Sequence, residues 1–143
     1  MSSQIVLLSL CFAISLINAL IDLKTHYLYD ALSILSFLLG ITLYIINPSQ
    51  FSIFRLFSVI FIIVLFFIFH KIKILELGDV KYIAGITPSI AFINPDIIYL
   101  GTFIFLIIVS IISILKKAFH KNAPYPAALL IFCSFAAGGL FFI

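Results

Sequence analysis

Charged residues are scarce in this sequence. Only 9% of its 143 residues are Asp, Glu, Lys or Arg, and 65% are hydrophobic, whereas an ordinary soluble domain carries about 25% charged residues. A water-soluble fold of this length has too little interior to hide so much apolar surface. The composition therefore excludes a soluble globular domain and indicates an integral membrane protein in contact with the lipid bilayer.

Cysteine is nearly absent as well. Cys11 and Cys133 are the two cysteines, and they stand in the first and last apolar stretches. Two residues placed in this way form neither a CxxC pair nor a disulfide framework, so packing is their expected role. The sequence also lacks a nucleophile elbow, a P-loop and a dinucleotide fingerprint. We therefore expect no bound cofactor.

Metal and nucleic-acid sites are not indicated either. His26, His70 and His120 fall in three separate polar breaks without the spacing of metal ligands, so we interpret them as interfacial side chains. The net charge of +3 comes from basic residues at the ends of apolar segments rather than from an exposed basic stripe. The charge pattern thus predicts membrane orientation and not a nucleic-acid partner.

Apolar runs separated by polar breaks predict six membrane-spanning helices. Each run is long enough, or nearly so, to cross a hydrocarbon core about 30 Å thick. The predicted spans are residues 4–21, 31–46, 51–69, 80–93, 97–115 and 123–143. The fourth span is the weakest, because it is short and contains Lys81 and Pro88. No linker or internal repeat divides the chain, so residues 1–143 are expected to form one domain.

Basic residues alternate between the breaks. The second break, 47–50, and the fourth, 94–96, contain no Lys or Arg, and cytoplasmic loops are the ones that concentrate these residues. This alternation requires the fourth span to cross, and it predicts an all-α bundle of six transmembrane helices with both termini outside. Arg55 is the exception, and snorkelling to the headgroups would explain it; Tyr82, near a helix end, is typical of an interface belt. The basic residues at the other breaks are Lys24 at the first, Lys71, Lys73 and Lys81 at the third, and Lys116, Lys117 and Lys121 at the fifth.

Two carboxylates fall at the cytoplasmic side. Asp22 closes the first predicted helix and Asp79 opens the fourth, and the crossings between them return the chain to the same face. Neighbouring carboxyls tend to share one proton, so the ionised group can take a proton from water while the other polarises a peptide carbonyl. The pair therefore predicts peptide hydrolysis without metal. The alternative is that Asp22 is a solvated helix-end residue and Asp79, after Gly78, a helix N-cap.

Two segments carry a family resemblance. Residues 21–30, IDLKTHYLYD, resemble the first motif of the type IV prepilin peptidases, in which an Asp after the first helix precedes basic residues, here Lys24, and a turn that here ends at Asp30. Residues 77–81, LGDVK, resemble the second motif, the GxGD signature followed by a hydrophobic residue and Lys. Residues 124–128, PYPAA, look like the proline-containing entry to the last helix of that family. In size the chain is similar to the short, Tad-type members.

The resemblance implies an intramembrane aspartic endopeptidase. Its catalytic residues would be Asp22 and Asp79, with Gly78 and Lys81 as motif residues beside the second. The implied substrate is a prepilin or pseudopilin, which has a short basic leader in the cytoplasm followed by a hydrophobic helix, and the cut falls at the cytoplasmic boundary of the plasma membrane of a prokaryote. Longer members also methylate their product and carry paired CxxC motifs, so we expect cleavage without methylation here.

Two positions depart from the family pattern. Glu76 replaces the first glycine of GxGD, and Tyr29 replaces a proline. Glycine would allow close backbone approach or a positive φ, and a third carboxylate would favour the protonated form of the pair; alternatively, Glu76 faces water beside Lys73. Lys81 would either bias the charge of Asp79 or anchor its helix in the headgroups. The competing functions are a proton or cation transport subunit and a catalytically inactive assembly subunit.

Overall fold

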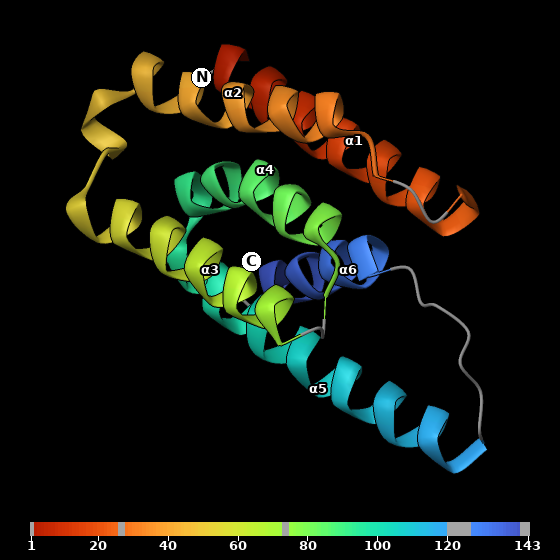
Figure 1. Ribbon diagram of the computed structural model, residues 1–143. Helices are drawn as coiled ribbons and strands as arrows, with labels where there is room; N and C mark the ends of the chain where they lie inside the picture. Colours follow the sequence, from red (N-terminus) through yellow and green to blue (C-terminus); the bar gives the residue numbers. More distant parts are fainter. Residues whose placement is uncertain (1, 26–27, 73–74, 120–126, 141–143) are drawn as a thin grey trace.

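The computed structural model describes residues 2–25, 28–72, 75–119 and 127–140. Over these residues the chain forms six α-helices and one 3-10 turn, and no strand occurs within them (Figure 1). The elements are α1 (Ser2–Thr25), α2 (Asp30–Ile46), η1 (Pro48–Gln50), α3 (Ile53–Lys71), α4 (Leu77–Ile93), α5 (Pro95–Phe119) and α6 (Ala127–Leu140). The prediction of an all-helical chain is confirmed, and the six helices follow in the predicted order.

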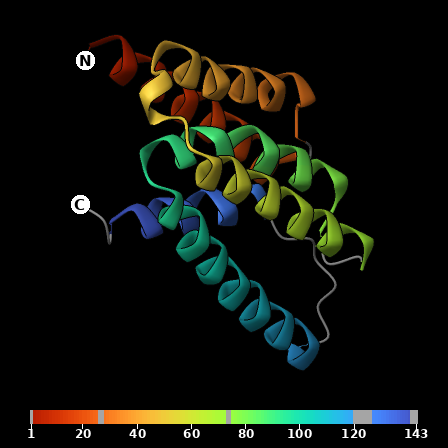
Figure 2. The ribbon, with the colours of Figure 1, turned by 90° about the vertical axis from the view of Figure 1, so that its left-hand side faces the viewer.

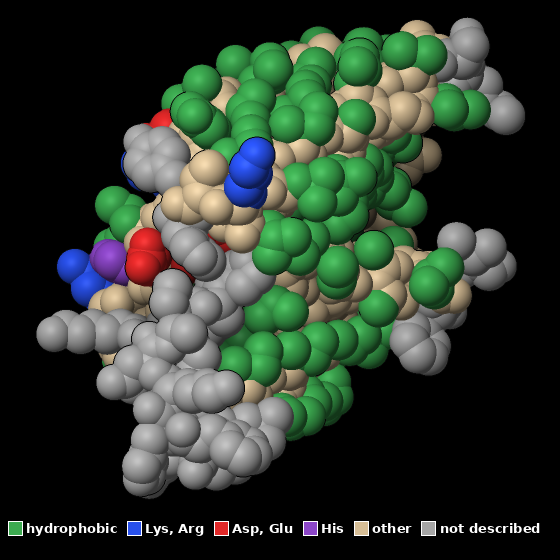
Figure 3. Space-filling model, turned by 90° about the vertical axis from the view of Figure 1, so that its right-hand side faces the viewer, with side chains coloured by type: hydrophobic (Ala, Val, Ile, Leu, Met, Phe, Trp, Pro, Cys, Tyr) green, Lys and Arg blue, Asp and Glu red, His purple; other side chains and the backbone are tan. Residues whose placement is uncertain are grey.

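Three of the helices are long and apolar enough to cross a membrane. They are α1 over Ser3–Thr25, α3 over Ile53–Lys71 and α5 over Pro95–Ile112. Large apolar side chains of α1, α2 and α3 remain exposed, and hydrophobic side chains cover a large area of the face in Figure 3. An exposed apolar surface of this extent is typical of contact with lipid or a partner. The remaining three crossings, and the side on which each terminus lies, stay predictions.

The helix α4 lies at the centre of the bundle. It contacts each of the other five α-helices, and both ribbon views show it enclosed by its neighbours (Figures 1 and 2). Twelve of its 17 residues are buried, among them Thr87, Pro88 and Ser89. A helix shielded from lipid by protein can carry polar residues and proline that a lipid-facing helix tolerates poorly. This central position explains why the fourth predicted span is the weakest in the sequence.

Two glycines let α2 and α4 approach each other closely. The contact between these helices is the most extensive of any helix pair in the described chain. A Cβ atom at Gly85 would lie 2.6 Å from the carbonyl oxygen of Ser33, and one at Gly40 would lie 2.9 Å from the Cβ of Pro88. Small residues at such crossings bring helix backbones together in membrane proteins. Gly85 therefore serves helix packing.

The inward face of α1 is polar. Four buried residues recur along it at intervals of three or four positions: Cys11, Ser15, Asn18 and Asp22. This interval places them on one side of a helix. The Ser15 hydroxyl lies 3.2 Å from that of Ser36, and Asn18 Nδ2 donates a hydrogen bond to Ser33 Oγ at 3.1 Å. These contacts align α1 with α2 and turn the side chain of Asp22 toward the interior.

Tyr82 lies differently from its prediction, and Arg55 makes contacts that the sequence does not predict. Tyr82 is 2% exposed and its hydroxyl donates to the Ser15 carbonyl oxygen at 3.1 Å, so its prediction as an interface-belt residue is wrong. Arg55 Nη1 donates to the carbonyl oxygens of Gln50 and Phe92 at 2.9 and 3.0 Å, and its snorkelling toward the headgroups stays a prediction. A cation suits carbonyls at the end of a helix, and here that helix is α4. The Tyr82 contact holds α1 to α4, and the contact of Arg55 with Phe92 holds α3 to α4.

The crossing of α2 and α4 yields the first prediction. The substitution Gly85→Ala should destabilise the protein by about 1–3 kcal/mol, because the added methyl group meets backbone that cannot move aside easily. The matched control is Gly139→Ala in α6, where a Cβ would meet nothing within 4 Å. Thermal unfolding of the purified proteins in detergent measures both changes. Equal midpoints for the two variants would contradict the packing role of Gly85.

Candidate active site

Asp22 lies in the last turn of α1 and is buried, with 7% of its surface exposed. Its Oδ2 accepts a hydrogen bond from the backbone N–H of Ala128 at 3.3 Å. Ala128 is the second residue of α6, and the first N–H groups of a helix lack partners within it and carry partial positive charge. This contact joins α1 to the start of α6. Asp22 is therefore not a solvated helix-end residue.

Asp79 is the third residue of α4 and is 6% exposed. Its Oδ2 accepts a hydrogen bond from the backbone N–H of Glu76 at 3.0 Å. Glu76 is the N-cap residue of α4, so Asp79 closes the helix start from inside the first turn, as the acidic residue of a capping box does. The N-cap position predicted as an alternative for Asp79 thus belongs to Glu76. The capping contact fixes the Asp79 carboxyl in the interior.

The two carboxylates line one cavity of about 210 Å³. They are distant in sequence, yet α1 ends where α4 begins, so the structure brings both to the same end of the bundle (Figure 1). The other lining residues are Leu28, Asp30, Glu76, Gly78 and Lys81. A space of this size with polar walls has room for water beside the carboxyl groups. The cavity thus brings together six of the seven residues that the two motifs single out, all but Lys24, and the Leu28 side chain forms an apolar wall.

The carboxyl group of Asp79 is shifted toward its protonated form. Asp79 precedes the predicted fourth span, 80–93, and its burial raises the pKa of its carboxyl group from about 4 to about 7. The hydrogen bond from Glu76 lowers this pKa, whereas the negative charges of Asp22 and Glu76 raise it. Near neutral pH Asp79 can therefore hold a proton that it is able to donate.

Charged residues surround this end of the bundle. Lys81 Nζ lies 2.6 Å from Asp30 Oδ2, and this ion pair joins the start of α4 to the start of α2. The contact of the Lys81 ammonium group is therefore Asp30 and not Asp79. Lys24 is exposed in the last turn of α1. Figure 3 shows acidic and basic side chains on one part of this face and hydrophobic side chains over a large area beside them.

The backbone explains how Glu76 fits where the family has glycine. Its φ is −81° and its ψ is 160°, an extended conformation open to any L-residue. A Cβ at Gly78 would lie 3.5 Å from Leu28 Cδ1, which is an ordinary contact. Neither position therefore needs glycine to form the fold. Lys73, the predicted neighbour of Glu76, lies outside the described residues.

The predicted interfacial histidines are only partly within the structure. His70 Nδ1 lies 3.1 Å from the carbonyl oxygen of Leu75, just before α4. His26 and His120 lie outside the described residues. In the part of the chain that the structure describes, no three His, Cys, Asp or Glu side chains gather as a metal site.

Sequence reasoning missed two residues that position the site. Asn18 Oδ1 accepts the Tyr29 N–H at 3.0 Å, and Nδ2 lies 3.4 Å from the Tyr29 carbonyl oxygen, so this side chain holds the segment that leads to Asp30. Tyr82, one turn after Asp79, ties α4 to α1. The available signal was Asn18 itself, because an amide inside an apolar span is costly unless it is paired.

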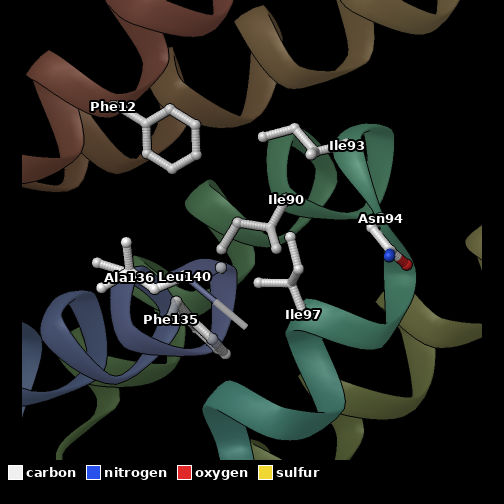
Figure 4. Close-up of a pocket in the computed structure, with 9 residues that line it drawn as sticks. Phe12, Ile90, Ile93, Asn94, Ile97, Phe135, Ala136 and Leu140 are labelled. Atoms are coloured by element: carbon white, nitrogen blue, oxygen red, sulfur yellow. The ribbon is translucent and has the colours of Figure 1, made fainter. Parts of the chain in front are cut away.

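A second cavity, of about 400 Å³, lies at the opposite end of α4 (Figure 4). Side chains from α1, α4, α5 and α6 converge on it. Its lining residues are Phe12, Ile90, Ile93, Asn94, Ile97, Phe135, Ala136, Gly139 and Leu140. None of these side chains is titratable, so this cavity offers no acid–base chemistry.

Comparison with known proteins does not assign the chain: no family model, no curated protein and no solved structure matches it. The functional argument therefore rests on the residues themselves. Its centre is the cavity that Asp22 and Asp79 share.

The raised pKa of Asp79 yields the second prediction. A carboxyl whose pKa is higher in the folded than in the unfolded chain makes the fold less stable as pH rises from about 4 to about 7, by at most about 4 kcal/mol. Asn does not titrate, so the stability of Asp79→Asn relative to the unsubstituted protein should increase over this range and level off above pH 7. Thermal unfolding at pH 5 and pH 8 measures the difference. The control is Asp96→Asn, because Asp96 is an exposed acid at the other end of the bundle. A stability difference between Asp79→Asn and the unsubstituted protein that does not change with pH would contradict the account.

Proposed function

We propose that this protein is an intramembrane aspartic endopeptidase of the prepilin peptidase type, which removes the short basic leader from a prepilin or pseudopilin. The observation that carries the proposal is the cavity lined by both Asp22 and Asp79. Two buried carboxyl groups in one water-accessible space are the arrangement that metal-free peptide hydrolysis requires. The GxGD-like segment supplies one of them and the segment after α1 supplies the other.

In the proposed mechanism the two carboxyl groups have opposite roles. The Asp22 carboxylate removes a proton from a water molecule, and the water oxygen attacks the carbonyl carbon of the scissile peptide. Protonated Asp79 donates its proton to the carbonyl oxygen, which gives a neutral tetrahedral diol. Collapse of the diol breaks the C–N bond: ionised Asp79 takes back a proton from one diol hydroxyl as the C=O bond re-forms, and the departing nitrogen takes up the proton that Asp22 had accepted. Both carboxyl groups thus return to their starting protonation states. The hydrogen bond from Ala128 to Asp22 and the raised pKa of Asp79 support these assignments.

The proposed setting is a six-span bundle in the plasma membrane of a prokaryote, with both termini outside and the active site facing the cytoplasm. The central burial of α4 supports its crossing, because the surrounding helices shield its polar residues. Lys24, Lys71 and Lys81 lie at the helix ends that share the carboxylate end of the bundle. Gln4 and Asn47 bond each other at the opposite end. Basic residues at the carboxylate end agree with a cytoplasmic active site.

The position of the carboxylates favours a peptidase over a transport subunit. Asp22 is in the last turn of α1 and Asp79 in the first turn of α4, so both belong to helix ends. Ion and proton carriers use carboxylates near the middle of the membrane. A cut between a cytoplasmic leader and a membrane helix needs its carboxylates at the boundary.

The backbone at position 76 argues against an inactive assembly subunit. Loss of activity through backbone distortion at position 76 would require a conformation that Glu cannot adopt. The extended conformation at Glu76, with φ of −81°, is ordinary. The Glu76 N–H donates a hydrogen bond to Asp79 Oδ2. The helix start therefore forms with Glu as it would with glycine.

The third prediction tests catalysis directly. Co-expression with a tagged prepilin, followed by gel mobility, reports removal of the leader. Asp22→Asn and Asp79→Asn keep the size of each side chain but remove the ionisable group, so each should lower processing by at least about 100-fold. Asp96→Asn should process normally, because Asp96 lies at the other end of the bundle. Cleavage by either Asn variant at the rate of the unsubstituted protein would show that the assignment of the pair is wrong.

A further inference from the structure

An apolar groove adjoins the carboxylate cavity. It has a volume of about 400 Å³ and runs along the most extensive helix contact, that of α2 with α4. Its apolar walls are Ile34 and Phe37 from α2 and Ala84 from α4. Ser33 and Gly85 complete this part of the lining. The groove therefore leads from the carboxylate end along the bundle.

The ion pair of Asp30 and Lys81 stands between the two spaces. Both residues line the carboxylate cavity, and both also line the apolar groove. A molecule that occupies both spaces therefore lies against this ion pair. The side chains are 54% and 45% exposed, so an incoming group can reach them.

We propose that Asp30 is a specificity-determining residue, which binds a basic residue of the substrate leader while the apolar segment that follows it enters the groove between α2 and α4. Lys81 occupies the same place when no substrate is bound. This inference rests on the proposed peptidase function and adds to it the means by which the leader is recognised.

The order of charged and apolar groups along the groove matches their order along such a substrate. Along α2, the acidic residue Asp30 comes first and the apolar residues Ile34 and Phe37 follow toward the interior. A leader peptide presents a cation and then an apolar segment in the same direction. Opposite charges and matched apolar surfaces set the register of such a contact. The basic residue would then stop beside the cavity that holds Asp22 and Asp79.

The energetics allow the exchange of one cation for another. An exposed ion pair contributes only about 0–1 kcal/mol, so releasing Lys81 costs little. Lysine has a long flexible stem, whereas Asp30 has a short side chain at the first residue of α2. The preceding residue, Tyr29, is held by Asn18 through its N–H at 3.0 Å. Asp30 is thus the fixed partner and Lys81 the movable one.

Two variants distinguish binding of the leader by Asp30 from a purely structural role of the ion pair. If the ion pair only ties α2 to α4, then Asp30→Asn and Lys81→Gln break the same bond and have the same effect. If Asp30 binds the leader, the two changes act in opposite directions. Asp30→Asn removes the binding group, whereas Lys81→Gln removes the competitor.

The test uses the purified full-length protein and two synthetic peptides. Each peptide has a short leader followed by an apolar segment, and they differ only in the last leader residue before that segment, Lys in one and Gln in the other. For the Lys peptide, Asp30→Asn should raise KM about three- to tenfold with kcat unchanged, and Lys81→Gln should lower KM by about threefold. The Gln peptide should show neither change, and Asp96→Asn should leave both peptides unaffected.

The outcomes distinguish the two proposals. Equal KM changes in the same direction for Asp30→Asn and Lys81→Gln, or no loss of preference for the Lys peptide in Asp30→Asn, would overturn the recognition role while cleavage itself still supports the peptidase. If the unsubstituted protein cleaves neither peptide, the peptidase function fails and the recognition role fails with it.

Discussion

The burial of two carboxyl groups in a single cavity is the constraint on which the rest of this structure depends. Asp22 and Asp79 are each less than a tenth exposed, and buried carboxylates are costly unless hydrogen bonds offset the loss of water. The donors are backbone N–H groups of Ala128 and Glu76. Each belongs to the start of a helix, α6 in one case and α4 in the other. The site therefore exists only where the end of α1 meets the starts of α4 and α6.

The arrangement of the helices follows from that requirement. The helix that carries Asp79 is the one that contacts all the other α-helices, so the position of Asp79 depends on the packing of the whole bundle. Contacts on both sides hold α4 there: Tyr82 bonds to α1, and Gly85 lets α2 approach. At its far end, Arg55 binds a carbonyl of its last turn. A change at any of these positions would act on the carboxylates through the position of α4.

The sequence predicts the elements of the fold well, because each depends on local composition. Apolar runs and the polar breaks between them locate the six helices, and the two helices between residues 22 and 79 explain why one end of the bundle holds both carboxylates. The fourth apolar segment is the shortest and carries polar residues and proline because it forms the helix that the others enclose. These features need no knowledge of how the helices are rotated.

The contacts within the site depend on that rotation, and so they escaped prediction. The donor to Asp22 is Ala128, which is 106 positions away, and nothing near either residue indicates the pairing. Lys81 had two predicted roles, and its contact with Asp30 was neither of them. The buried side of α1 could have been recognised from Ser15 and Asn18, which recur at helical spacing with Asp22 in an otherwise apolar run. This spacing therefore predicts which side of α1 faces the interior, and with it the direction in which Asp22 points.

The central claim, that the side chains at positions 22 and 79 face one cavity, is open to a direct measurement by chemical cross-linking. Asp22→Cys and Asp79→Cys are combined in a background with Cys11→Ser and Cys133→Ser, and membranes are treated with a short bifunctional thiol reagent. The account predicts an intramolecular cross-link in the intact mass of this protein, and none when Asp22→Cys is combined with Asp96→Cys. Free labelling of both new cysteines without a cross-link between positions 22 and 79 would contradict it.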